Sequence, residues 1–94
     1  MIPTPGPPYE WDEDKRQQNS KLHGVDFTLV HRANWGAATH QRSDRQEELR
    51  YSSYVPVDGR IHNVVWTPRD HSTRIISFRK ANTRETARYD REKL

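Results

Sequence analysis

The chain has 94 residues, no cysteine and an apolar fraction of 31 %. Leu, Ile, Val and Phe make up only 16 of the 94 residues, close to the composition of chains that form no packed core. These counts exclude a disulfide framework and a cysteine nucleophile. They favour one small domain that a partner helps to cover. With no apolar stretch of about 18 residues and no signal-peptide pattern, we expect a cytoplasmic protein.

The charged residues are rich in arginine and unevenly distributed. Sixteen Lys and Arg residues against 13 Asp and Glu leave a net charge of +3, and the excess lies in residues 48–94. The planar guanidinium group binds phosphate oxygens at two points and stacks on bases. This bias favours a nucleic-acid or acidic-protein partner, although a simply solvated surface has the same composition.

The N-terminal half predicts a leader, a short strand and two helices. Residues 1–8 hold four of the six prolines and predict a disordered leader, followed by a single domain over 9–94. A short strand is expected at 9–11. A helix follows from Asp12 to Leu22, with acidic residues in its first turn and Gly24 as its stop. A second short helix starts with Asp26 as N-cap and ends near 34–36.

The C-terminal half predicts a sheet and one helix. Residues 37–46 indicate a loop or a frayed strand, and strands are expected over 47–55, 60–67 and 73–80, joined by turns as an antiparallel meander. Asn82 and Glu85 have the spacing of a capping box, which starts the last helix. The order β-α-α-β-β-β-α predicts an α+β fold.

No motif for metal or cofactor chemistry is present. The five histidines lack zinc-motif spacing, and the sequence has neither a Gly-rich phosphate loop nor a Gly-x-Ser-x-Gly elbow, so we predict no metal and no cofactor. RNA cleavage needs only a base for the 2′-hydroxyl proton, cations for the transition state and an acid for the leaving oxygen. The residues that could transfer these protons are His23, His62, Glu48, Glu85 and Tyr89.

Several blocks of the sequence resemble those of BrnT-type toxins in order and spacing. They are EWD at 10–12 with KLHGVDF at 21–27, RY at 50–51, DGR at 58–60 with VVWT at 64–67, and RIISFRKANTRE at 74–85 followed by Tyr89. Together they span about residues 9–91. The resemblance implies a RelE-like fold and a ribonuclease toxin of a type II toxin–antitoxin pair, which would inhibit translation and growth.

The same resemblance implies partners and site residues. The partners would be an RNA substrate and a BrnA-type antitoxin with a ribbon-helix-helix, operator-binding domain, joined with the toxin in a hetero-oligomer. The implied catalytic residues are Arg50, Arg74 and Arg79 on strands, Glu85 and Tyr89 on the last helix, and His23. The residues expected to bind RNA are Arg60, Lys80, Arg84, Arg88 and Trp66.

Two departures from the family pattern leave alternatives open. Leu49 stands where the family has glutamate, so Glu48 would have to serve, and Phe78 replaces an alanine. The chain could therefore be a non-catalytic nucleic-acid-binding module or a degenerate, antitoxin-binding relative. In addition, Arg74 and Arg79 lie five residues apart, which places them on opposite faces of a strand unless a bulge intervenes.

Overall fold

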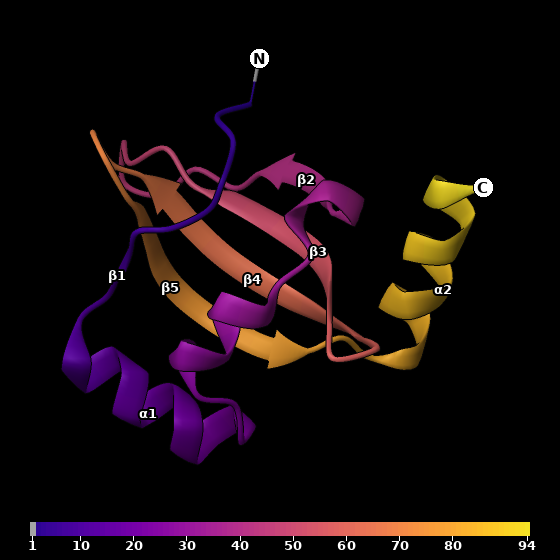
Figure 1. Cartoon of the computed structure of the whole chain (residues 1–94), viewed down its shortest axis with the longest axis horizontal. Coiled ribbons are helices and arrows are strands. Elements are labelled where there is room, and N and C mark those ends of the chain that lie inside the picture. Colours follow the sequence, from indigo (N-terminus) through magenta and orange to yellow (C-terminus); the bar gives the residue numbers. More distant parts are fainter. Residues whose placement is uncertain (1) are drawn as a thin grey trace.

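The computed structural model describes residues 2–94, which form an α+β domain built on one five-stranded sheet (Figure 1). The strands stand in the order β1-β5-β4-β3-β2. Their bounds are β1 Tyr9–Glu10, β2 Thr39–Arg42, β3 Tyr51–Val57, β4 Arg60–Pro68 and β5 Thr73–Lys80; the helices are α1 Glu13–His23 and α2 Thr83–Lys93, with short 3-10 helices η1 Phe27–Arg32 and η2 Trp35–Ala37. No helix in residues 2–94 is long and apolar enough to cross a membrane.

The predicted antiparallel meander is confirmed for β3, β4 and β5. The short strand expected at 9–11 is β1 at one edge of the sheet, and β2 at the other edge lies in the segment expected to be a loop or a frayed strand. β1 pairs parallel to β5, with Tyr9 opposite Thr73. The preceding proline-rich segment continues this contact: the Gly6 N–H donates to Thr73 Oγ1 at 3.0 Å, and the Thr73 N–H donates to the Pro8 carbonyl at 3.0 Å. Met1, the first residue of the predicted leader, lies outside the described residues.

β2 and β3 form a hairpin where the sequence predicts a loop or a frayed strand over 37–46. The polar segment Thr39–Arg42 is the edge strand β2, because its backbone pairs with β3 from Thr39 opposite Tyr54 to Arg42 opposite Tyr51. The expected strand start at Glu47 is wrong. Gln46 and Glu47 have φ values of 49° and 66°, the left-handed conformation of a two-residue hairpin turn. β3 therefore begins only at Tyr51.

The second predicted helix is shorter and tighter than expected. Asp26 is its N-cap, as predicted, and accepts a hydrogen bond from the Thr28 N–H. The helix is of the 3-10 type and ends at Arg32, because the next residues join the sheet region. Ala33 bridges to Val57, and the Asn34 N–H donates to the Pro56 carbonyl at 2.9 Å.

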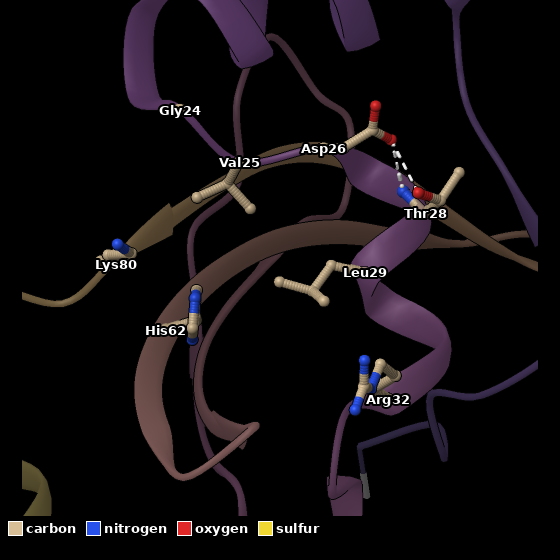
Figure 2. A pocket seen from close by; sticks show the side chains of 8 residues that line it. All are labelled: Gly24, Val25, Asp26, Thr28, Leu29, Arg32, His62 and Lys80. Carbon is tan, nitrogen blue, oxygen red and sulfur yellow. Dashed lines mark hydrogen bonds between the residues drawn. The ribbon is translucent and has the colours of Figure 1, made fainter.

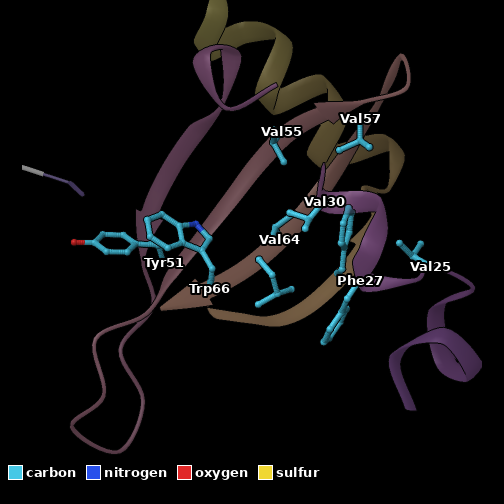
Figure 3. Packing of buried hydrophobic residues seen from close by; sticks show 10 residues of the cluster. Val25, Phe27, Val30, Tyr51, Val55, Val57, Val64 and Trp66 are labelled. Carbon is cyan, nitrogen blue, oxygen red and sulfur yellow. The ribbon is translucent and has the colours of Figure 1, made fainter. Parts of the chain in front are cut away.

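The core lies against one face of the sheet, under η1 (Figure 3). Alternate side chains of β3 to β5 meet residues from the α1–η1 segment there, namely Val25, Phe27, Val30, Tyr51, Val55, Val57, Val64, Trp66, Ile75 and Phe78. Asn19 of α1 closes the free edge of β5. Its Nδ2 donates to the Phe78 carbonyl at 2.6 Å, and its Oδ1 accepts from the Phe78 N–H at 3.1 Å.

A β-bulge at Ile76 resets the alternation of β5. Ser77 pairs with Val65 and Ile75 pairs with Trp66, which leaves Ile76 without a partner on β4. Ile75 and Phe78 are consequently both buried, although they are three residues apart. The extra residue also brings Arg74 and Arg79 to the same face of the sheet, the face opposite the core.

Candidate functional site

We call the sheet face opposite the core the open face. It is defined by Ser52, Tyr54, Asn63, Val65, Thr67, Arg74, Ser77 and Arg79, which pair across β3, β4 and β5 in register. Most of these side chains are polar, while most of the buried apolar residues of the same strands point to the core. The helix α2 follows the end of β5 (Figure 1), and its Glu85 is hydrogen-bonded to Arg79 on this face.

A cluster of three side chains from three elements occupies one end of the open face. Arg79 of β5 donates two hydrogen bonds to Glu85 of α2, from Nη1 to Oε1 at 2.7 Å and from Nη2 to Oε2 at 2.8 Å. The Tyr54 hydroxyl of β3 donates to Oε2 at 2.7 Å. The predicted capping box is present, and through it the Asn82 N–H donates to Glu85 Oε1 at 2.9 Å.

The charges of this cluster are fixed by its hydrogen bonds. The Arg79 guanidinium, with further help from Asn82 and Tyr54, lowers the pKa of Glu85 to about 2. Burial and the hydrogen bond to Glu85 raise the pKa of Tyr54 above its usual value of about 10. At neutral pH the cluster thus holds a carboxylate, a cation and a neutral hydroxyl at hydrogen-bond distance.

Arg74 of β5 and Arg50, which directly precedes β3 instead of lying within a strand as expected, are paired as well. Arg74 Nη1 meets Glu10 Oε2 at 3.0 Å, and Arg50 Nε meets Glu48 Oε1 at 2.7 Å. Arg74 and Arg79 are five positions apart on β5, roughly 16 Å, so the structure does not bring Arg74 into the cluster. It does place all three arginines where one extended polyanion could contact them.

Tyr89 and His23 lie apart from the cluster. Tyr89 is 8 % exposed, and its hydroxyl donates to the Ala37 carbonyl at 2.5 Å, which ties α2 to η2. His23 is exposed at the end of α1, and within residues 2–94 no hydrogen bond or ion pair joins it to Arg79 or Glu85.

His62 lies on the core side of the sheet, where it lines a pocket with Leu29 and Lys80 beside η1 (Figure 2). Its Nδ1 is hydrogen-bonded to the Arg60 carbonyl at 2.8 Å. A carbonyl oxygen only accepts, so this nitrogen carries the proton. The sheet separates His62 from the open face, which removes it from the candidates for proton transfer at Arg79.

The predicted RNA-binding residues divide into exposed and buried ones. Arg60, Lys80, Arg84 and Arg88 are exposed, with Arg88 paired to Glu92 in the next turn. Trp66 is 1 % exposed, its Nε1 donates to Ser53 Oγ, and Tyr51 stacks on its ring. The prediction that Trp66 binds RNA is therefore wrong, because a ring that is buried in the core offers no surface on which a base could stack.

Both departures from the family pattern have a simple place in the fold. Phe78 is fully buried and points into the core, away from Arg79. Leu49 packs against the core, and its carbonyl accepts from Thr67 Oγ1 at 2.6 Å. The neighbouring Glu48 supplies the carboxylate beside Arg50.

Tyr54 is the residue of the cluster that sequence reasoning missed. On β3 the buried residues Ser53 and Val55 flank it, so it shares a face with Ser52. The sequence pattern that could have identified Tyr54 is a large aromatic side chain at a position where the alternation of the strand predicts the polar face. Packing in the core does not explain a side chain on that face.

Two comparisons with known proteins give matches, and a third gives none. A family model described as the ribonuclease toxin BrnT of a type II toxin–antitoxin system matches residues 11–85. Among solved structures, the Brucella abortus ribonuclease toxin BrnT is 27 % identical with a TM-score of 0.61, over 80 % of this chain and 96 % of that chain. No curated protein matches. The matched residues include Tyr54, Arg79 and Glu85 and end before Tyr89.

Proposed function

Because the chain belongs to the BrnT family of ribonuclease toxins of type II toxin–antitoxin systems, we propose that it cleaves RNA on the open face, at Arg79, Glu85 and Tyr54. The observation that carries this proposal is the double hydrogen bond between Arg79 and Glu85, which Tyr54 also joins. A cation, a base and an acid thereby meet on one surface, and in the proposed reaction these three groups act without a metal ion.

In this mechanism the ribose 2′-hydroxyl gives its proton to the Glu85 carboxylate and attacks the adjacent phosphorus. The O2′–P bond forms and the P–O5′ bond breaks, while Tyr54 protonates the departing 5′-oxygen. The products are a 2′,3′-cyclic phosphate and a 5′-hydroxyl. Proton transfer from Glu85 to Tyr54 through their 2.7 Å hydrogen bond then restores both groups.

Arg79 links substrate binding to the basicity of Glu85. A carboxylate with a pKa of about 2 is a weak base at neutral pH. A phosphate that binds Arg79 competes for the N–H groups that now contact Glu85. Losing those hydrogen bonds moves the pKa of Glu85 toward its ordinary value of 4.5, so Glu85 becomes a better base when substrate is bound. The freed guanidinium stabilises the charge of the transition state.

The remaining predicted residues take supporting roles in this proposal. Arg50 and Arg74 bind phosphates of the same RNA strand along the open face, and Arg60, Lys80, Arg84 and Arg88 attract the RNA from the surface around α2. Tyr89 lies one helical turn after Glu85 and holds α2 in place through Ala37, so it is a positioning residue. His23 has no role at the reacting phosphate.

Membership of a toxin–antitoxin family implies an antitoxin partner. We propose that this partner is of the BrnA type, that its ribbon-helix-helix domain binds operator DNA, and that the two proteins form a hetero-oligomer. The toxin domain would adopt the RelE-like arrangement and act in the cytoplasm, where cleavage of RNA stops translation and growth.

The proposal is tested by incubating the purified protein with single-stranded RNA in EDTA and identifying the product ends. We expect cleavage that leaves cyclic phosphates, and its loss in Arg79→Ala with RNA binding largely kept. Intact RNA at stoichiometric wild-type protein, with the fold verified by circular dichroism, would refute it. If the wild type binds that RNA without cleaving it, the chain is a binding module; if it neither binds nor cleaves, it is an antitoxin-binding relative.

A further inference from the structure

A hollow of about 430 Å³ opens on the open face between the hairpin tip and the sheet. Ser43, Arg45 and Arg50 line it from the hairpin, and Val65, Ile76 and Ser77 line it from β4 and β5. It lies outside the cluster of Arg79, Glu85 and Tyr54, and of its lining residues only Arg50 has a role in the proposed cleavage, as a phosphate-binding residue.

The floor of the hollow is apolar, which is unusual on this polar face. Val65 and Ile76 are both half-buried there, and neither belongs to the core. Ile76 is the bulge residue, so the same extra residue that aligns the arginines also places this side chain. Bulges often re-aim a side chain next to a functional site.

The rim of the hollow is cationic and hydroxylic. Arg50 lies on it beside Glu48, while Asp44, the one acidic lining residue, is paired with Arg42 at 2.6 Å. Arg45 has no ion-pair partner among residues 2–94. Ser43 and Ser77 offer hydroxyl groups on opposite sides. An apolar floor with a guanidinium above it suits a flat, uncharged ring that is attached to an anion.

The hollow lies next to the cluster along β5, at the adjacent pair of residues on the open face. Ser77 pairs with Val65, and Arg79 pairs with Asn63 in the next row of the same face. Ser77 and Arg79 are two positions apart on β5, so the two rows are roughly 7 Å apart. An RNA strand with one phosphate on Arg79 therefore has an adjoining nucleotide at the hollow.

We propose that this hollow is the base-binding subsite of the enzyme. It receives the nucleobase next to the cleaved phosphate, which packs on Ile76 and Val65 while Arg45 and Arg50 contact its backbone and the serine hydroxyls contact its edge. The hollow thus determines where RNA is cut. This inference rests on the proposed ribonuclease function, since the subsite takes its substrate from that reaction.

The test compares Ile76→Ala with Ile61→Ala. Ile61 of β4 also lies on the open face and is half-buried like Ile76, but it does not line the hollow. Each variant is incubated with an RNA of random sequence, and sequencing of the product ends gives the base preference at the cleavage site. We expect Ile76→Ala to flatten the preference and to raise KM about tenfold, as for the loss of a stacking contact, and Ile61→Ala to change neither.

Unchanged preference and KM in a folded Ile76→Ala variant would overturn the subsite. If Ile76→Ala does not fold, Ser77→Val provides the same comparison, with the same expected and refuting results. If the wild type fails to cleave, the ribonuclease proposal fails on its own. The subsite is then judged by fluorescence anisotropy with a short single-stranded RNA: weaker binding by Ile76→Ala supports it, and equal binding overturns it.

Discussion

Replacing Arg79 with Met removes the guanidinium group but keeps much of the side chain's apolar bulk, which isolates the electrostatic contribution of the ion pair with Glu85. The pKa of Glu85 lies at about 2 in the fold against 4.5 ordinarily. Each pKa unit corresponds to about 1.4 kcal/mol, so the full shift corresponds to about 3 kcal/mol. Because Arg79 is 33 % and Glu85 18 % exposed, solvent screening reduces the expected loss to about 2 kcal/mol at pH 7.

The pH dependence provides the stronger test of this pair. A carboxyl group with a lowered pKa stabilises the fold fully above its unfolded value of 4.5, and this stabilisation is lost as the pH falls toward about 2. Urea unfolding of wild type and Arg79→Met between pH 7 and pH 3 should therefore give curves that converge, with more than half of the difference gone at pH 3. Arg88→Met, which breaks an exposed pair with Glu92, should lose under about 0.5 kcal/mol. A difference for Arg79→Met that stays constant with pH would refute the reasoning.

Three further predictions concern other parts of the molecule. Tyr54→Phe keeps the ring and removes the hydroxyl that donates to Glu85, so single-turnover cleavage should fall about a hundredfold with RNA affinity nearly unchanged; a wild-type rate would exclude Tyr54 as the acid. Asn19→Ala leaves the Phe78 backbone groups unpaired and should lower the free energy of unfolding by about 2 to 4 kcal/mol in urea, whereas exposed Gln17→Ala should change it little; equal losses would contradict the edge-closing role. Burial lowers the pKa of His40 and His62, so both resist protonation in the fold, and urea titrations should show stability falling as the pH drops below about 6.5; a flat profile from pH 7 to pH 5 would argue against it.

The sequence predicted the elements whose signals are local. Asp12 and Gly24 bound α1, and Asn82 with Glu85 starts α2, because a cap depends on residues within one turn. β2 was less clear, since its segment Thr39–Arg42 has no apolar alternation and is a strand only through its pairing with β3.

Features that depend on distant residues could not be read from the sequence. The bulge at Ile76 arises from the register of β5 against β4. From the sequence alone, Arg74 and Arg79 could share a face only if such a bulge were present. Trp66 was misassigned because an aromatic residue in a basic strand fits either a core or an RNA surface. In the fold the ring is buried and its Nε1 donates to Ser53 Oγ on β3, a contact between residues 13 positions apart that the sequence does not reveal.

The bulge divides β5 into two parts that pair with β4 in different registers, and Ile76 joins the two parts. The first part, with Arg74, is aligned by β1 and Glu10, while the second, with Phe78 and Arg79, is aligned by Asn19 and Glu85. Deleting Ile76 would force the two parts into a single alternation. Either Phe78 would leave the core as Arg79 entered it, or Arg74 would turn away from Glu10. The number of residues in this strand, and not only their identity, therefore keeps the cations and the core on their separate faces.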